Sequence, residues 1–74
     1  MNKFKPRELE NFLFYERIRR SGKFNMITEA YGAAKAAGLT IDEYKNVIRN
    51  YVDYKKFVEC KYGSVDNFII TARN

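Results

Sequence analysis

The sequence predicts an all-α protein: a compact three- or four-helix domain with a helix-turn-helix-like central pair. Apolar residues recur at helical spacing along the chain, and typical helix-starting residues (Pro6, Asn25 and Thr40) precede these runs. Glycines follow the runs at positions 22, 38 and 63, where helices are expected to end. A chain of 74 residues suits one domain, so we expect a single helical domain over 1–74. Its helices are predicted at about 6–21, 26–37, 41–61 and 65–72.

The first helix is expected from Pro6 to Ser21. Proline suits the first helical position, because the N–H that it lacks would have no partner there. Glu8 and Glu10 lie near the positive end of the helix dipole, and a group of arginines lies near the negative end. The apolar residues span so broad an arc that this helix should be buried against more than one neighbour.

The second helix is expected over 26–37, with Asn25 as its N-cap. Its many alanines allow close packing, and Gly32 in its middle suggests a tight crossing with another element. Thr40 and Glu43 form a capping box that opens the third helix, which should run to about residue 61. Its apolar face is predicted from helical spacing to contain Tyr44, Val47, Ile48, Tyr51, Val52 and Val58.

The last segment, 65–72, allows two interpretations. Ser64 can cap a short final helix. The run Phe68–Thr71 is instead compatible with an extended segment, because β-branched residues favour strands.

The sequence lacks the combinations of residues that catalysis usually needs, so no catalytic residue, metal site or cofactor is predicted. The chain contains no histidine, and its one cysteine, Cys60, has no evident base partner and is expected to be a buried apolar residue. No pattern of metal ligands is present. One cysteine cannot form an internal disulfide, and there is neither a signal peptide nor an apolar run of about 18 residues. We therefore expect a cytoplasmic protein that does not enter a membrane.

Charge and aromatic residues suggest a surface for binding a partner. The net charge is +5, and seven of the basic residues lie in residues 1–24. A cluster at the end of the first helix either complements the helix dipole or forms a site for an anionic group. Tyr54 and Phe57 lie off the main apolar stripe, beside basic residues, as in many binding surfaces. The predicted partner-binding residues are Arg17, Arg19, Arg20, Lys23, Tyr54, Lys55 and Phe57.

The main alternative is a DNA-binding helix-turn-helix. Ala34, Gly38 and Leu39 have the spacing of such a corner, in which a small residue allows close packing and glycine makes the turn. Four residues would then face a DNA groove: Thr40, Lys45, Asn46 and Arg49. Asp42 and Glu43 oppose this interpretation, because they would repel phosphate. A weaker alternative is an oligomeric protein that sequesters a nucleotide signal in a cationic pocket.

The run from Ile18 to Met26 (Ile-Arg-Arg-Ser-Gly-Lys-Phe-Asn-Met), with two following helices, resembles a group of short uncharacterised bacteriophage proteins. The resemblance covers about residues 17–60, and this chain extends beyond it at both ends. It implies a viral or mobile-element origin and supplies no activity. Small phage proteins often bind and redirect host machinery, including antiviral defence. The resemblance therefore implies a non-enzymatic protein that modulates or inhibits a host or defence protein, or a protein–nucleic acid complex. A homodimer is a further expectation for so short a chain.

Overall fold

The computed structural model describes residues 4–73, so the two ends of the predicted domain, residues 1–3 and 74, lie outside it. The described chain forms five α-helices and no strand. The all-α prediction is confirmed, whereas the predicted number of three or four helices is wrong because the third predicted helix is broken in two. The helices are α1 (Pro6–Ser21), α2 (Ala30–Ala37), α3 (Ile41–Arg49), α4 (Tyr51–Tyr62) and α5 (Val65–Arg73).

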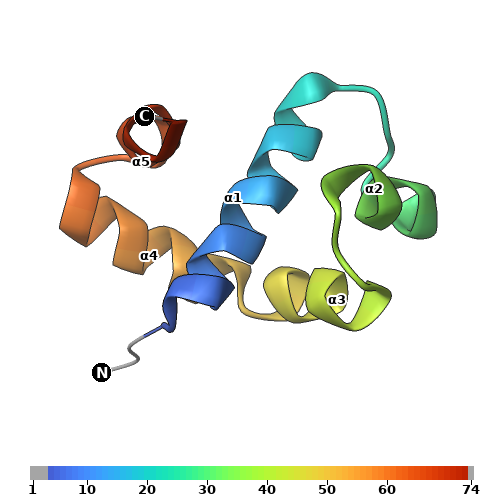
Figure 1. Ribbon diagram of the computed structural model, residues 1–74, viewed down its shortest axis with the longest axis horizontal. Helices are drawn as coiled ribbons and strands as arrows, with labels where there is room; N and C mark the ends of the chain where they lie inside the picture. Colours follow the sequence, from blue (N-terminus) through green and yellow to red (C-terminus); the bar gives the residue numbers. More distant parts are fainter. Residues whose placement is uncertain (1–3, 74) are drawn as a thin grey trace.

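Helix α1 runs through the middle of the molecule, with α2 and α3 on one side and α4 and α5 on the other (Figure 1). It contacts α2, α3 and α4, and α5 packs on α4. This central position accounts for the broad apolar arc of α1, because neighbouring helices bury it from two sides.

Helix α1 begins and ends where the sequence predicts. The backbone N–H of Lys5 donates to the Glu8 carboxylate at 2.8 Å and closes the first turn. At the other end Gly22 adopts a φ of 71°, a left-handed conformation that costs glycine little. The last turn therefore contains Arg19 and Arg20.

The predicted helix over 26–37 starts four residues late, at Ala30. Asn25 does act as a cap, since its Oδ1 accepts the N–H groups of Ile27 and Thr28, both at 3.0 Å. The Glu29 carboxylate in turn accepts the Asn25 N–H at 2.8 Å. These bonds close residues 26–29 into a separate turn, and Glu29, with φ −111° and ψ 34°, departs from helical geometry before α2 begins.

The glycine inside α2 is explained by an aromatic ring rather than by a helix crossing. A Cβ atom at Gly32 would lie 3.4 Å from Cε1 of Phe24. The loop between α1 and α2 therefore folds back onto α2, and the close approach predicted at Gly32 is made by this ring.

The corner between α2 and α3 is fixed by local backbone hydrogen bonds and by a glycine in a left-handed conformation. Gly38 has a φ of 78°, its N–H bonds to the Lys35 carbonyl at 3.1 Å, and the Leu39 N–H bonds to the Ala34 carbonyl at 2.9 Å. This pair of bonds is a Schellman motif. The predicted capping box follows, because Thr40 Oγ1 accepts the Glu43 N–H at 3.1 Å and a Glu43 oxygen accepts the Thr40 N–H at 2.9 Å.

The predicted continuous helix over 41–61 is wrong, because the chain bends at Asn50, where φ is −108° and ψ is 20°. The Asn50 side chain donates to the Asn46 carbonyl at 3.1 Å and so competes for a main-chain partner of the helix. The Tyr54 hydroxyl donates to Asn46 Oδ1 at 3.2 Å and ties the two halves together. The bend leaves Ile48 and Val52 exposed at 41% and 61%, so they do not join the apolar face as predicted.

The last segment is helical, not extended. Ser64 Oγ accepts the Asn67 N–H at 3.0 Å and caps the first turn of α5. Val65 and Phe68 of α5 are buried, and the centroid of the Phe68 ring lies 5.1 Å from the centroid of the Tyr62 ring in α4. Helix α5 therefore adds a second wall beside α4.

The core is aromatic and is organised around α1. Phe12 is fully buried and stacks on Tyr54 at 5.2 Å between ring centroids. Tyr15 contacts Tyr44 at 5.3 Å and Tyr51 at 5.9 Å, which joins α1 to both α3 and α4. The Tyr44 hydroxyl finds a partner in the Met26 carbonyl at 2.7 Å, so its burial leaves that group satisfied.

Candidate functional site

Two arginines of the predicted basic cluster are held by intramolecular ion pairs. Arg19 donates two hydrogen bonds to the carboxylate of Glu16, at 2.9 and 3.0 Å, and Arg20 donates a third at 3.3 Å. Arg20 also pairs with Asp66 of α5. Glu16 is completely buried, whereas both arginine side chains are about two-fifths exposed. Arg19 and Arg20 thus serve to pair a buried carboxylate and to join α1 to α5.

The pKa values around Glu16 keep this group charged. Burial raises the pKa of Glu16, but the hydrogen bonds and charge of the two arginines outweigh burial, so the pKa lies below its usual value. The same hydrogen bonds raise the pKa of Arg19. The pKa of Tyr51 is raised to about 12, first by burial and then by the neighbouring Glu16 carboxylate. At neutral pH the cluster is therefore a fixed ion-pair network with little free positive charge.

The other two members of the cluster, Arg17 and Lys23, are exposed and form no ion pair within residues 4–73. Arg17 borders a hollow of about 160 Å³ between α1 and α2, together with Phe14, Ile18, Ala36 and Ala37. A second hollow, of about 220 Å³, contains Arg20 and Lys55 but also Glu59 and Asp66, so its mixed charge suits an anion poorly. The four predicted cations therefore do not converge on one site.

The predicted aromatic surface is partly wrong. Tyr54 is only 1% exposed, because it lies between Phe12 and Phe4 and its ring stacks on Phe4 at 4.1 Å. The prediction placed Tyr54 off the apolar stripe, and the bend at Asn50 turns it inward. Phe57 is half-buried, and Lys55 is exposed.

Two of the four residues predicted to contact DNA have side chains that form hydrogen bonds within the protein. Lys45 and Arg49 are exposed on α3. The Thr40 hydroxyl is used in the capping box, and Asn46 Oδ1 accepts the Tyr54 hydroxyl. Two of the four predicted contacts to DNA are therefore already engaged inside the protein.

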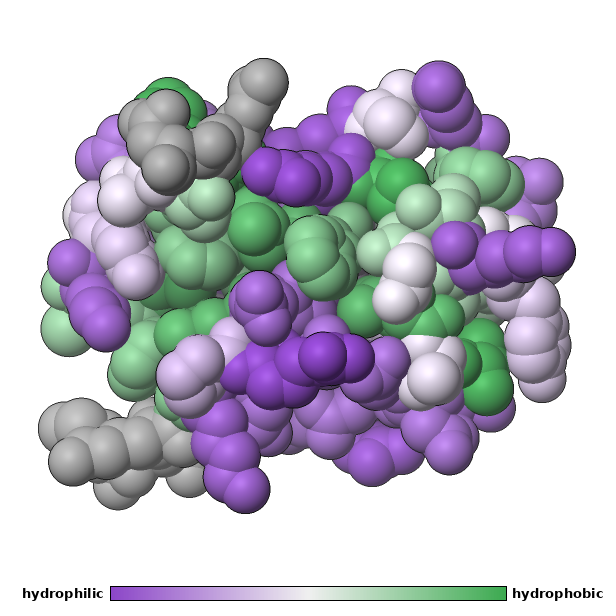
Figure 2. All heavy atoms as spheres, viewed as in Figure 1, coloured by the Kyte–Doolittle hydropathy of each residue, from purple (hydrophilic) through white to green (hydrophobic). Residues whose placement is uncertain are grey.

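An open groove of about 340 Å³ lies where α1, α4 and α5 meet, and we call it the α1–α4–α5 groove. Each of three helices contributes a pair of residues four positions apart, Pro6 at the start of α1 adds to the lining, and the segment before α1 adds Phe4. In the space-filling view, apolar side chains form a band across this face of the molecule, on both sides of α1 (Figure 2). The groove is lined by Phe4, Pro6, Leu9, Glu10, Leu13, Phe57, Lys61, Tyr62, Phe68 and Ala72.

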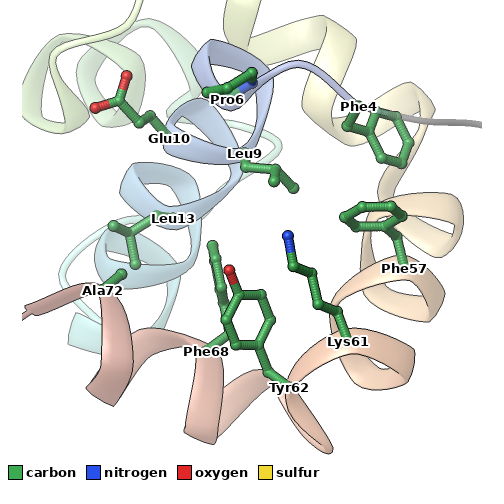
Figure 3. A pocket seen from close by; sticks show the side chains of 10 residues that line it. All are labelled: Phe4, Pro6, Leu9, Glu10, Leu13, Phe57, Lys61, Tyr62, Phe68 and Ala72. Atoms are coloured by element: carbon green, nitrogen blue, oxygen red, sulfur yellow. The ribbon is translucent and has the colours of Figure 1, made fainter.

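The walls of the groove are mainly aromatic and aliphatic. Phe4 packs edge-on against Phe57 at 5.6 Å and closes one end. In the close-up, the ammonium of Lys61 points into the space between the walls, whereas the carboxylate of Glu10 points away from it (Figure 3). The Lys61 ammonium lies 5.7 Å from the centre of the Tyr62 ring. A groove of this volume and lining is typical of sites that take apolar groups with one polar contact.

Sequence reasoning found Phe57 but missed the groove around it. The available signals were the i, i+4 pairs Leu9–Leu13, Phe57–Lys61 and Phe68–Ala72, which place two side chains on one helix face. The bend at Asn50 and the turn at Gly63 determine which helix faces meet at the groove. The angles between the helices at these two points cannot be predicted from the spacing of residues in the sequence.

Two of the most exposed apolar residues lie far along the chain from the groove. Ile27, in the turn before α2, is 84% exposed, and Tyr31, four residues later in the first turn of α2, is 73% exposed. They form a projecting pair rather than a hollow.

The chemistry available in the described residues is limited. Cys60 is exposed on α4, so its predicted burial is wrong. No group of three or more Asp, Glu or Cys side chains within residues 4–73 is arranged to hold a metal ion. None of the five helices is long and apolar enough to cross a membrane.

Comparisons with protein-family models, with curated proteins and with solved structures give no match. The candidate site therefore rests on the physical chemistry of this chain alone, and the α1–α4–α5 groove is the feature best suited to binding.

Proposed function

We propose that the protein is a non-enzymatic binding protein that holds a segment of a partner protein in the α1–α4–α5 groove. The observation that carries the proposal is the groove itself, about 340 Å³ of open space lined by Phe57, Phe68 and other apolar residues. The half-buried members of the lining, such as Phe57 and Leu9, gain free energy when a complementary apolar surface covers them.

A protein segment suits the groove for geometric reasons. The lining residues are presented by three helices in pairs four residues apart, which leaves a channel between helix faces. Such channels accept an amphipathic helix, whose own anchors recur at three- and four-residue spacing. Aromatic residues, phenylalanine among them, are enriched at protein interfaces, which suits Phe57 to this role.

The resemblance of the Ile18–Met26 run to short phage proteins suggests where to search for the partner. We propose a bacterial host component, including those of antiviral defence, whose activity changes when the groove is occupied. Arg17 and Lys23, which are exposed at the end of α1 and in the loop after it, would add long-range attraction for an acidic partner.

Blocking the groove should abolish capture of the partner. Ala72 lines the groove, whereas Thr71, its neighbour on α5, does not, and both are exposed. We expect Ala72→Trp to reduce the amount of partner retained from bacterial lysate about tenfold or more, because the indole fills the space that an anchor would occupy. Thr71→Trp should retain the partner as the wild type does. Equal retention by Ala72→Trp and wild type would rule out the groove as the binding site.

DNA binding remains the second candidate, because the Schellman corner at Gly38 sets α3 against α2 and leaves Lys45 and Arg49 exposed. The engaged Asn46 and the acidic start of α3 weigh against it. We expect any binding to duplex DNA at about 50 mM salt to vanish by about 200 mM, as non-specific phosphate contacts do. The measurement is a titration of labelled duplex at both salt concentrations. Submicromolar binding at the higher concentration, lost in Lys45→Ala and Arg49→Ala, would favour DNA instead.

A further inference from the structure

Among the side chains that the structure describes, Lys61 is the basic one that lines the α1–α4–α5 groove, and its ammonium points into the hollow (Figure 3). The ion pairs of residues 4–73 are made by Arg7, Arg19 and Arg20, so Lys61 has no carboxylate partner in the described structure. Glu10, the acidic residue among the described residues that line the groove, turns its carboxylate away from the space (Figure 3). The groove thus combines apolar walls with one unpaired positive charge.

This combination restricts what can cover the groove. In the free protein, water solvates the Lys61 ammonium through the open side. A wholly apolar segment would remove that water and leave a buried unpaired charge, which is costly. A segment that brings a carboxylate to the ammonium replaces the lost water with a charge-assisted hydrogen bond. The net charge of +5 also favours an acidic partner during approach.

We infer that the partner segment carries an aspartate or glutamate beside its apolar anchors, and that this carboxylate pairs with Lys61. The inference rests on the proposed function, because it assigns the chemistry of the ligand for the same groove. The apolar anchors contact the half-buried side chains of Phe57, Leu9 and Tyr62, and the acidic residue sets the register of the segment in the groove.

A random 12-residue peptide library, displayed and selected on the immobilised full-length protein, tests the inference without knowledge of the natural partner. Selection is run in parallel on wild type, Lys61→Gln, Lys61→Glu and Ala72→Trp. Lys56→Gln serves as the matched control, because Lys56 is exposed on the same helix and does not line the groove. Peptides enriched on wild type are expected to carry Asp or Glu next to apolar residues, at about threefold or more above the library.

The variants should change this preference in a defined way. Lys61→Gln should lose the acidic preference, Lys61→Glu should select Lys or Arg instead, and Lys56→Gln should behave as wild type. The dissociation constant of the best wild-type peptide should rise about tenfold or more on Lys61→Gln, as expected for loss of one charge-assisted contact. Lys61→Arg should restore most of the affinity.

The outcomes separate the inference from the proposed function. Peptides that bind wild type and Lys61→Gln equally but fail to bind Ala72→Trp would overturn the role of Lys61 and leave the groove as a binding site. Peptides that bind Ala72→Trp as well as wild type, or no enrichment over Ala72→Trp at all, would overturn both. Circular dichroism melting of each variant shows that differences in binding do not arise from unfolding.

Discussion

Replacing Phe12 by alanine is expected to lower the free energy of unfolding by about 3–5 kcal/mol, the usual cost of emptying a fully buried aromatic site. Phe12 is 0% exposed, and its ring contacts Tyr54 at 5.2 Å, Tyr51 at 5.6 Å and Phe68 at 6.1 Å. These three rings belong to α4 and α5, so one truncation loosens the attachment of both helices to α1. Small domains have a total stability of roughly 5–15 kcal/mol, so the loss is a large fraction of it and most of it at the low end of that range.

Urea unfolding followed by circular dichroism measures the effect. Phe14→Ala is the matched control, because Phe14 lies on the same helix but is only half-buried. We expect it to cost less than about 2 kcal/mol, since less apolar surface returns to water. Equal losses for the two variants would mean that the aromatic core around Phe12 does not hold the helices together.

Replacing Glu16 by glutamine should be the next most damaging change. The buried carboxylate accepts three hydrogen bonds from Arg19 and Arg20. Glutamine keeps the shape but removes the charge and places an amide N–H₂ near the guanidinium groups. The expected cost is about 2–3 kcal/mol, the range for hydrogen bonds to charged groups. The half-exposed arginines recover some hydration, which keeps the cost below that of a fully buried pair.

The lowered pKa of the Glu16 carboxylate predicts how the free energy of unfolding depends on pH. The pKa of Glu16 is lowered in the folded protein, whereas it takes its ordinary value of about 4.3 in the unfolded chain. The unfolded state therefore binds a proton first as pH falls. The stabilisation from Glu16 is fully present above the unfolded pKa and is lost as pH falls through the folded pKa.

Unfolding curves between pH 7 and pH 2 test this sign. Wild type should lose stability on acidification. Glu16→Gln should lose less, because the stabilisation from the charged Glu16 carboxylate is already absent in this variant. Some acid sensitivity must remain, since the pKa of Glu43 is also lowered, chiefly by the hydrogen bond from the Thr40 backbone. Glu10→Gln, at an exposed site on the same helix, should follow the wild-type curve. A Glu16→Gln curve parallel to wild type would contradict the assignment.

Local signals predicted much of the fold. Pro6 and Gly22 bound α1, and the Thr40–Glu43 capping box opens α3, because these features are made by residues close together in the chain. The break at Asn50 was not predictable from helical spacing. Asparagine is tolerated inside helices, and the side-chain bonds that accompany the bend, from Asn50 to the Asn46 carbonyl and from the Tyr54 hydroxyl to Asn46 Oδ1, cannot be read from that spacing. The late start of α2 has a similar origin, since Glu29 closes a turn that the sequence pattern does not distinguish from a helix.

The candidate site depended still more on tertiary structure. The arginine cluster was visible in the sequence, but its partner Glu16 is an acidic residue that would ordinarily be placed on the surface. The burial of Tyr54 follows from the bend at Asn50, and the groove follows from the way α5 returns beside α1. Phe57 was identified from the sequence. Lys61 was not, because its charge becomes a candidate binding feature only when the structure places it beside the apolar walls of the groove.

The most direct test of the account is to locate the bound partner on the protein by NMR. A partner segment captured from lysate, or the best selected peptide, is titrated into ¹⁵N-labelled protein and the amide shifts are followed. We predict the largest shifts at Leu9, Leu13, Phe57, Lys61 and Phe68, with none of comparable size at Tyr31 or Lys45. Shifts centred on α2 or α3, with the groove residues unchanged, would contradict the proposal that this protein binds through the α1–α4–α5 groove.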